Sequence, residues 1–297
     1  MNQKINPVLA WGTRTFIMGI INLTPDSFSG DGMLDKEDVV MAAVAQAETF
    51  LRDGADILDI GGESTRPGAE AVSEEEEVAR VIPVINAIRA SFPEVIISID
   101  TYKSTVARQA LDTGANWVND IWGFKTDFSL ASVVAEWHVP VVLMHNRSKP
   151  GSAALEARLG GRYVGVDYDD LIRDICNELL ESVTVAHEHG ISDEHIILDP
   201  GIGFGKTIAQ NLELIDRLDE IKALGYPILA GPSRKSFIGY TLNLPPQERI
   251  EGTAAAVALC IDRGADIIRV HDVRMMTRVA RMTDAIVRRE HPEGKDF

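Results

Sequence analysis

A regular alternation of short apolar runs with longer amphipathic segments, along the whole length, constrains this chain most. The short runs suit buried strands, and the longer segments have the spacing of helices that cover a sheet. Strands that alternate with helices imply parallel βαβ units. The eight apolar runs are Phe16–Leu23, Ile57–Ile60, Ile96–Asp100, Trp117–Asp120, Pro140–His145, Ile196–Asp199, Pro227–Ala230 and Ile267–Val270.

The joints between the helical segments and the following strands repeat a short pattern. Gly54-Ala55, Gly114-Ala115 and Gly264-Ala265 each end a helical segment just before an apolar run, and a glycine there can take the left-handed helix cap. A doubly wound sheet could use the same joint, but eight units favour a single closed (βα)8 barrel. The chain of 297 residues fits one such domain over residues 1–297. The helical segments are expected at Asp38–Arg52, Glu74–Ala90, Thr105–Asp112, Leu130–Glu136, Tyr168–Glu188, Asn211–Leu224, Glu248–Asp262 and Val273–Arg288.

Charge and cysteine content exclude several classes of partner. The formal net charge of −16 would repel a polyanionic backbone, so nucleic acid is not an expected partner. Cys176 and Cys260 are too few for a disulfide framework or a zinc site. Met1–Pro7 lacks the pattern of a signal peptide, and no apolar run approaches the roughly 20 residues of a membrane span. We therefore expect a cytoplasmic protein without a membrane partner.

Polar side chains stand at or just beyond the carboxyl end of every predicted strand. In a barrel these ends converge on one mouth, where the chemistry of such folds takes place. Buried carboxylates at strand ends are costly unless something pairs with them, so they are candidate site residues. The residues are Asn22, Glu63, Thr65, Arg66, Asp100, Asn119, Asp120, His145, Asp199, Ser233, Arg234, Lys235, Arg269 and His271.

Four of these residues suit a flat heterocycle. Asp100 and Asp199 are acceptors, Asn119 is both donor and acceptor, and Lys235 is a donor. Two N–H groups of an amidine-like edge could face one carboxylate, and a ring carbonyl could face the lysine. One side of the mouth is therefore predicted to bind a heterocycle.

The other side of the mouth suits an anion. Arg269 and His271 follow the last strand, with Asn22 and Thr65 expected nearby, and loops after the last strands of barrels commonly bind phosphate. The alternative is that these charged residues form only a structural network of aspartates with lysine or arginine.

The Gly-rich stretch Asp199–Thr207 is not a nucleotide motif. The first glycine of a P-loop would fall on Pro200, and the third glycine of a dinucleotide fingerprint would fall on Lys206. Neither ATP nor NAD is implied. The long segment Asn146–Asp167, after the fifth strand, is expected to be either a lid or an insertion that contains a short helix.

Taken together, these motifs resemble dihydropteroate synthases, the folate-pathway enzymes that join a pterin to p-aminobenzoate. The motifs span nearly the whole chain and are specific as a set. They read MGIINLTPDSFS at 18–29, DIGGESTRPG at 59–68, ISIDT at 97–101, NDI at 119–121, LMHNR at 143–147, LDPGIGFGK at 198–206, SRKSFIG at 233–239 and RVHDV at 269–273.

The resemblance implies a (βα)8 barrel and a role for each matching residue. It implies Mg²⁺ as the metal, bound by Asn22 together with the diphosphate of the substrate. The pterin would be held by Asp100, Asn119, Asp199 and Lys235 between Met144 and Phe204. The diphosphate would be held by Asn22, Thr65, Arg66, Arg269 and His271. The p-aminobenzoate, whose site sulfonamides also occupy in this family, would contact Thr65, Arg66, Pro67, Phe204 and Ser233.

The family's reaction proceeds through departure of diphosphate to leave a pterin-methyl cation, which the arylamine attacks. The resemblance makes Asp100, Lys235 and a loop aspartate the catalytic residues, and it implies a homodimer through late helices. After Ser29 many relatives read Asp-Gly-Gly, whereas this chain has Gly30-Asp31-Gly32. The loop aspartate is then Asp31, shifted by one residue. Tyr102 stands where a small residue is common, so it either narrows the mouth or points outward.

Two rival functions share parts of this pattern. A pterin-binding methyltransferase domain has the same barrel and carboxylate contacts but no use for the segments Thr24–Ser29 and Ser233–Ser236. A non-catalytic pterin-binding paralogue should lack the loop aspartate, Lys235 or the Arg269 and His271 pair, and this sequence has all of them.

Overall fold

A computed structural model describes residues 9–24, 36–64, 69, 71–148, 153–164 and 167–288. The predictions made for Asp31, Thr65, Arg66 and Pro67 lie outside these residues. So do most residues of the two loops that follow the first two strands.

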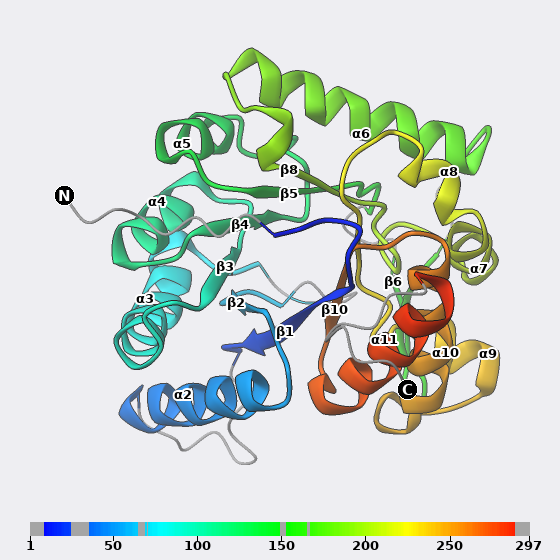
Figure 1. Cartoon of the computed structure of the whole chain (residues 1–297), viewed down its shortest axis with the longest axis horizontal. Coiled ribbons are helices and arrows are strands. Elements are labelled where there is room, and N and C mark those ends of the chain that lie inside the picture. The colour runs from blue at the N-terminus through cyan, green and yellow to red at the C-terminus, as the bar shows by residue number, and fades with distance from the viewer. Residues whose placement is uncertain are drawn as a thin grey trace.

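Eight parallel strands form the centre of the molecule, and helices surround them (Figure 1). The order across the sheet is β8-β5-β4-β3-β2-β1-β10-β9, and each strand matches one of the predicted apolar runs. The strands are β1 (Phe16–Asn22), β2 (Ile57–Gly61), β3 (Ile96–Asp100), β4 (Trp117–Asp120), β5 (Val141–Met144), β8 (Ile196–Asp199), β9 (Leu229–Ala230) and β10 (Ile267–Val270).

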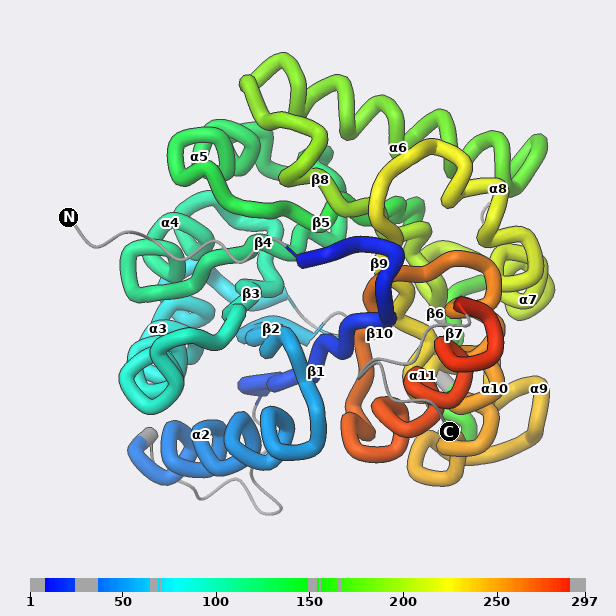
Figure 2. Tube along the Cα trace, in the orientation of Figure 1, coloured from blue at the N-terminus to red at the C-terminus, as the bar shows by residue number. Residues whose placement is uncertain are grey.

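The sheet closes into a barrel where β8 approaches β9 (Figure 2). A parallel bridge joins Leu198 to Ile228, just before β9. The buried Asp266 supports this seam, because its Oδ2 accepts the backbone N–H of Ile228 at 2.8 Å and Nζ of Lys222 at 2.6 Å. The prediction of a (βα)8 barrel is confirmed.

The helices follow the predicted segments with a few differences, among them an unpredicted 3-10 turn at Asp193–His195 before β8. The segment predicted as Asn211–Leu224 is two helices, because Arg217 has a non-helical backbone between them. A short helix after β9 was not predicted, and a 3-10 turn at Pro246–Glu248 precedes α10. The helices are α2 (Lys36–Arg52), α3 (Glu74–Ser91), α4 (Ser104–Thr113), α5 (Ser129–Trp137), α6 (Leu171–Glu188), α7 (Ile208–Asp216), α8 (Leu218–Lys222), α9 (Ser236–Leu242), α10 (Ile250–Asp262) and α11 (Val273–Val287).

Side chains inside the barrel change from apolar to polar along the strands. At the amino ends a buried apolar cluster includes Met18, Ile57, Trp117 and Ile267. Trp11 packs against this cluster, with its ring near that of Trp117. Residues two positions further along the same strands are polar or charged at several places, among them Asp59, Asn119 and Arg269. Because alternate residues of a strand face the same side, both sets point into the barrel. The apolar floor leaves only the carboxyl-end mouth for polar chemistry.

The short helix considered for the insertion between β5 and α6 does not occur in the part of it that the structure describes. Its described part is an antiparallel hairpin of β6 (Ala153–Glu156) and β7 (Gly160–Tyr163). Gly160 has a φ of +72° at the turn, and two adjacent glycines disfavour a helix. Tyr163 of this hairpin stacks near Phe204, with ring centroids 6.3 Å apart. The insertion therefore covers one side of the mouth.

Within the described residues, we find no helix that has both the length and the apolar character needed to cross a bilayer.

The seam residue Asp266 gives a test of the closed barrel. Asp266→Ala should lower the free energy of unfolding by about 2–3 kcal/mol, because it leaves the buried Ile228 N–H without an acceptor and Lys222 without its partner. Urea unfolding followed by circular dichroism measures this. The matched control is Asp216→Ala, which breaks the exposed ion pair with Arg263 and should cost less than about 0.5 kcal/mol. Equal costs for the two variants would contradict the role of Asp266.

Candidate functional site

Arg269 joins two carboxylates in the mouth of the barrel. Its Nε donates to Oδ2 of Asp59 and its second terminal nitrogen, Nη2, donates to Oδ2 of Asp100, both at 2.6 Å. Asn119 donates from Nδ2 to the same Asp59 oxygen at 3.1 Å. Four strands, β10, β2, β3 and β4, thus contribute one interconnected polar cluster, with β1 between β10 and β2. The asparagine and the guanidinium are both held in place before any substrate arrives.

The electrostatics of this cluster are set by burial. Burial raises the pKa of Asp100 to about 7, and the charge of Asp59 raises it as well, whereas Arg269 lowers it. Burial by itself lowers the pKa of Arg269, but the two carboxylates more than offset this, so its pKa lies above its usual value. Arg269 therefore stays charged while Asp100 is poised between its two protonation states near neutral pH.

Asp199 ends β8 and is held by the loop that follows. Its Oδ1 accepts the N–H of Gly201 at 2.7 Å. Burial raises the pKa of Asp199 to about 6, opposed by the Gly201 N–H and by the charges of Lys235, Lys206 and Arg269. Asp199 is therefore mostly ionised at neutral pH and can accept from paired N–H groups of a ligand.

An apolar wall stands beside these carboxylates. Met144 and Phe204 belong to one buried cluster together with Ile121. The ammonium of Lys235 lies 3.9 Å from the centre of the Phe204 ring, a cation–π contact that places the lysine against the wall. Tyr102 packs against the same cluster and its hydroxyl donates to Glu63 at 3.3 Å, so it lies at the mouth and does not point away from it.

Ser233 and His271 form a second pair at the mouth. The backbone N–H of His271 donates to Ser233 Oγ at 3.2 Å, and that oxygen lies 3.0 Å from Nδ1 of the same histidine. Burial and the charges of Arg269, Arg234 and Lys235 lower the pKa of His271 to about 3, so the ring is neutral. In the tautomer in which Nδ1 accepts from the serine hydroxyl, the ring proton is on Nε2, and this N–H can donate to an anion.

Asn22 is the residue that the sequence assigned to a metal. It ends β1, is half-buried and pairs in register with Gly61. No group of three His, Cys, Asp or Glu side chains that could hold a metal occurs among the described residues. A single amide oxygen still fits Mg²⁺, because this ion usually keeps several waters and binds through one or two protein oxygens plus substrate phosphates.

The structure departs from the sequence-based division of the mouth in two respects. Arg269, predicted on the anion side, pairs with Asp100, which was predicted on the heterocycle side. Asp120, singled out as a strand-end carboxylate, instead accepts the backbone N–H groups of Trp122 and Phe124 and holds the turn after β4.

Asp59 was missed by the sequence reasoning. It lies in the middle of β2, is fully buried and pairs with Arg269. A usable signal was present, because the alternation Ile57, Asp59, Gly61 places Asp59 on the inward face of a strand whose end was already identified. A charged residue on that face needs a partner inside the barrel.

Comparisons with known proteins give matches over most of the chain. The family model described as "Pterin binding enzyme" matches residues 18–271. The dihydropteroate synthase of Clostridium beijerinckii is 53% identical over 279 residues, which cover 94% of this chain and 96% of that protein.

Solved structures are similar over almost the whole chain. A Clostridium difficile dihydropteroate synthase crystallised in the presence of pteroic acid aligns with a TM-score of 0.86 at 45% identity, covering 94% of this chain and 99% of that one. A Xanthomonas albilineans dihydropteroate synthase with 4-aminobenzoic acid aligns with a TM-score of 0.81 at 41% identity, covering 92% and 93% of the two chains.

The coupling between Asp59 and Asp100 can be measured directly. Asp59→Asn should move the pKa of Asp100 from about 7 to a lower value, because a neighbouring negative charge is removed while Arg269 remains. Carboxyl-carbon NMR titration of the substrate-free protein reads this out. Asp262→Asn, an exposed carboxylate on α10, should leave the titration unchanged. A pKa of Asp100 that stays the same or rises would contradict the proposed coupling.

Proposed function

The chain belongs to the dihydropteroate synthase family of pterin-binding enzymes, and on that premise we propose which of its residues carry out the family's reaction. That reaction condenses a dihydropterin methyl diphosphate with p-aminobenzoate to give 7,8-dihydropteroate and diphosphate. The observation that carries the assignment of residues is the buried cluster of Asp59, Asp100, Asn119 and Arg269 at the mouth of the barrel.

We propose that Asp199, Asn119, Asp100 and Lys235 bind the pterin ring. The buried carboxylate of Asp199 can accept the two N–H groups of the amidine-like edge, and the ammonium of Lys235 can donate to the ring carbonyl. The wall of Met144 and Phe204 offers apolar contact to the faces of the ring. The fact that these side chains lie at or beyond the carboxyl ends of β8, β4, β3 and β9 supports this assignment.

The diphosphate is proposed to bind beside Arg269, His271 and Asn22, with Thr65 and Arg66 added from outside the described residues. When the pterin diphosphate enters, Arg269 can keep its contact with one carboxylate and turn its remaining N–H groups toward the phosphate oxygens. His271 donates from Nε2 without carrying a charge of its own. Asn22 would hold Mg²⁺, which supplies positive charge to the departing oxygens when it is bound.

The chemistry follows from charge stabilisation. The C–O bond to the diphosphate breaks, and the positive charge that develops on the pterin methyl group delocalises into the ring. The carboxylate of Asp100 stabilises that charge, and Arg269 stabilises the departing anion. The aromatic amine is already a nucleophile and attacks without a strong base, and the proton it then loses is taken up by the released diphosphate. The loop residue Asp31 is proposed to face the cation and, with the two loops, to keep water out.

The p-aminobenzoate is proposed to bind between Phe204, Ser233 and the segment Thr65–Pro67. Ser233 offers a hydroxyl at the mouth, and Phe204 offers the face of its ring. The ammonium of the neighbouring Lys235 would attract either the carboxylate of p-aminobenzoate or the ring carbonyl of the pterin.

Two alternatives are less well supported. A pterin-binding methyltransferase domain would not account for relatives that are dihydropteroate synthases over nearly their whole length. A non-catalytic paralogue would not need to retain Asp100, Lys235, Arg269 and His271 together.

We propose further that residues 1–297 form one domain and that the protein is a homodimer. Exposed apolar side chains gather on the last two helices, which lie side by side (Figure 1). Leu259 on α10 and Met275, Met282 and Ile286 on α11 are each at least 46% exposed, as expected of surfaces that a partner covers. A cytoplasmic location also stays a prediction, supported by two free cysteines.

Pterin binding tests the role of Asp199. Asp199→Asn should raise the dissociation constant of a dihydropterin by about 10- to 100-fold, or roughly 1.4–3 kcal/mol, because an amide cannot accept both N–H groups. In the wild type, affinity should fall as the pH drops through about 6, where Asp199 takes up a proton. Isothermal titration calorimetry measures both. An unchanged affinity in the variant would refute the assignment.

Removal of metal tests the role of Asn22. EDTA should abolish diphosphate release from the pterin substrate in the presence of p-aminobenzoate, and excess Mg²⁺ should restore it. Asn22→Ala should raise the Mg²⁺ concentration needed for half-maximal rate by about tenfold. Full activity in EDTA, or an unaltered Mg²⁺ requirement in the variant, would show that Asn22 does not mark a metal site.

A further inference from the structure

Lys206 is a buried cation to which the proposed reaction assigns no role. Only 3% of the residue is exposed. Its Nζ lies 3.0 Å from Nδ1 of His145 and donates to the carbonyl oxygens of Gly201 at 3.0 Å and Phe204 at 3.2 Å. An ammonium group has three N–H donors and no acceptor. The three surrounding acceptors therefore fit the charged form of the lysine.

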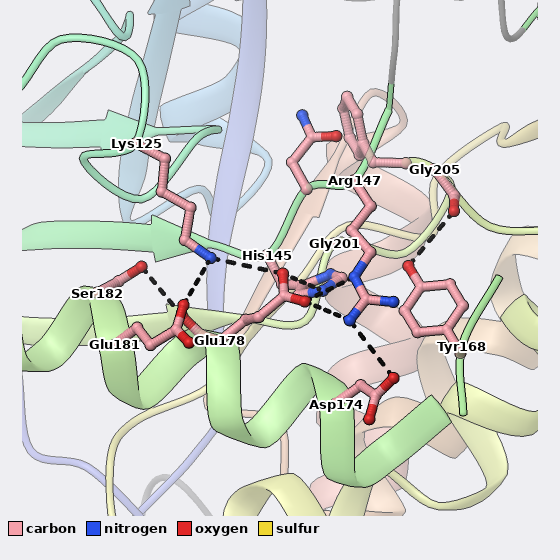
Figure 3. Close-up of polar contacts among 12 residues, drawn as sticks. Lys125, His145, Arg147, Tyr168, Asp174, Glu178, Glu181, Ser182, Gly201 and Gly205 are labelled. Atoms are coloured by element: carbon pink, nitrogen blue, oxygen red, sulfur yellow. Dashed lines mark hydrogen bonds and ion pairs between the residues drawn. The ribbon is translucent and has the colours of Figure 1, made fainter. Parts of the chain in front are cut away.

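The contact with His145 continues outward to charged groups on α6. Because Nδ1 of His145 accepts from Lys206, its ring proton is on Nε2, which lies 3.2 Å from Glu178. Burial and the charge of Lys206 lower the pKa of His145 to about 4, so the ring is neutral. Glu178 also accepts from Nε of Arg147 at 2.6 Å. Figure 3 shows His145 and Arg147 above α6, with Glu178 reaching up to them.

The loop at residues 200–205 packs backbone to backbone against residues 145–148. A Cβ on Gly201 would lie 1.9 Å from the carbonyl oxygen of His145, and one on Gly205 would lie 2.6 Å from the backbone nitrogen of Ser148. Both glycines have positive φ, +71° and +58°, which other residues rarely adopt. Tyr168 adds a hydrogen bond from its hydroxyl to the Gly205 carbonyl at 3.3 Å (Figure 3). The loop therefore has one well-defined position.

That position matters for the pterin site because the loop carries Phe204 and holds the carboxylate of Asp199, which directly precedes it. Gly201 donates its backbone N–H to Asp199, and its carbonyl oxygen accepts from Lys206. The Phe204 residue accepts from Lys206 at its carbonyl, and its ring faces Lys235. The buried ammonium of Lys206 thus binds backbone carbonyls near both ends of the loop, beside Asp199 and at Phe204.

The charges around Lys206 come from several elements. Burial lowers the pKa of Lys206 to about 7, opposed by the charges of Asp199 on β8 and Glu178 on α6 and assisted by those of Arg147 and Lys235. In turn the charge of Lys206 lowers the pKa of Asp199, which burial has raised to about 6. In the pH range where Asp199 titrates, Lys206 is therefore largely protonated.

Building on the proposed function, we propose that Lys206 is a positioning residue for pterin binding. Its ammonium group, held by His145, fixes the 200–205 loop through two carbonyls and keeps the neighbouring carboxylate of Asp199 ionised. Lys206 does not touch the substrate in this account; it acts through Asp199 and Phe204.

The test compares Lys206→Met with Lys125→Met by calorimetric titration of a dihydropterin over a series of pH values. Lys125 also lies near Glu178, at 3.5 Å, but on the solvent side of the network, so its variant removes the same charge without touching the loop. Lys206→Met should weaken pterin binding by about tenfold at neutral pH. It should also raise the pH midpoint at which affinity falls on acidification (the acid limb of binding), because the carboxylate of Asp199 loses a stabilising positive charge. Lys125→Met should leave both unchanged.

The shift of the acid limb separates positioning from simple loss of stability, because a destabilised but folded protein would keep the wild-type midpoint. Lys206→Arg, which retains the charge, should keep the midpoint even if its affinity falls. A wild-type midpoint in Lys206→Met would overturn the inference. If the wild type itself does not bind the pterin, the proposed function fails, and that outcome is distinct from failure of the Lys206 role.

If Lys206→Met does not yield folded protein, His145 variants carry the test. His145→Gln keeps an acceptor toward Lys206 and a donor toward Glu178, whereas His145→Leu keeps neither. The leucine variant should bind the pterin about tenfold more weakly than the glutamine variant. Equal affinities would overturn the inference.

Discussion

The ion pairs of Arg269 with Asp59 and Asp100 are the interaction on which the rest of the site depends. A guanidinium inside a barrel is costly unless carboxylates and further hydrogen bonds compensate its lost hydration. Here two carboxylates do so, and Asn119 uses the same Asp59 oxygen. Because the partners come from four strands, the cluster also fixes how those strand ends face one another. The same contacts that make the buried cation tolerable therefore arrange the groups proposed to bind the substrate.

The barrel keeps this cluster at one end by filling the other end. Apolar side chains such as Met18 and Trp117 close the floor, so substrate can reach the charged groups only from the mouth. The polarity of the mouth differs from side to side. An apolar wall that includes Phe204 forms one side, and the neutral Ser233–His271 pair forms another. An aromatic ring with a polar edge and an anionic tail, as in a pterin diphosphate, complements such a surface.

Much of the fold could be predicted because the signals are local. The eight strands follow from apolar runs and the mouth residues from what stands at the strand ends. What could not be predicted depends on contacts between distant segments. The pairing of Arg269 with Asp59 joins residues 210 positions apart, and the burial of Lys206 depends on how a Gly-rich loop packs against residues 145–148.

Short elements were missed for a different reason. The hairpin strands β6 and β7 read AALE and GGRY, so neither contains an apolar run like those that marked the equally short barrel strands. The break at Arg217 carries no proline or glycine, so nothing in the local sequence marks it. Asp59 could have been found, because strand alternation alone turns it inward.

The most direct test of the account is the steady-state rate of diphosphate release by Arg269→Lys. Lysine keeps the charge but cannot bridge two carboxylates with a planar fork of donors. We predict that kcat falls by about 100-fold or more, whereas the KM for p-aminobenzoate changes less than about threefold, because the lost interaction is with the departing anion. A kcat equal to that of the wild type would contradict the central place given to Arg269.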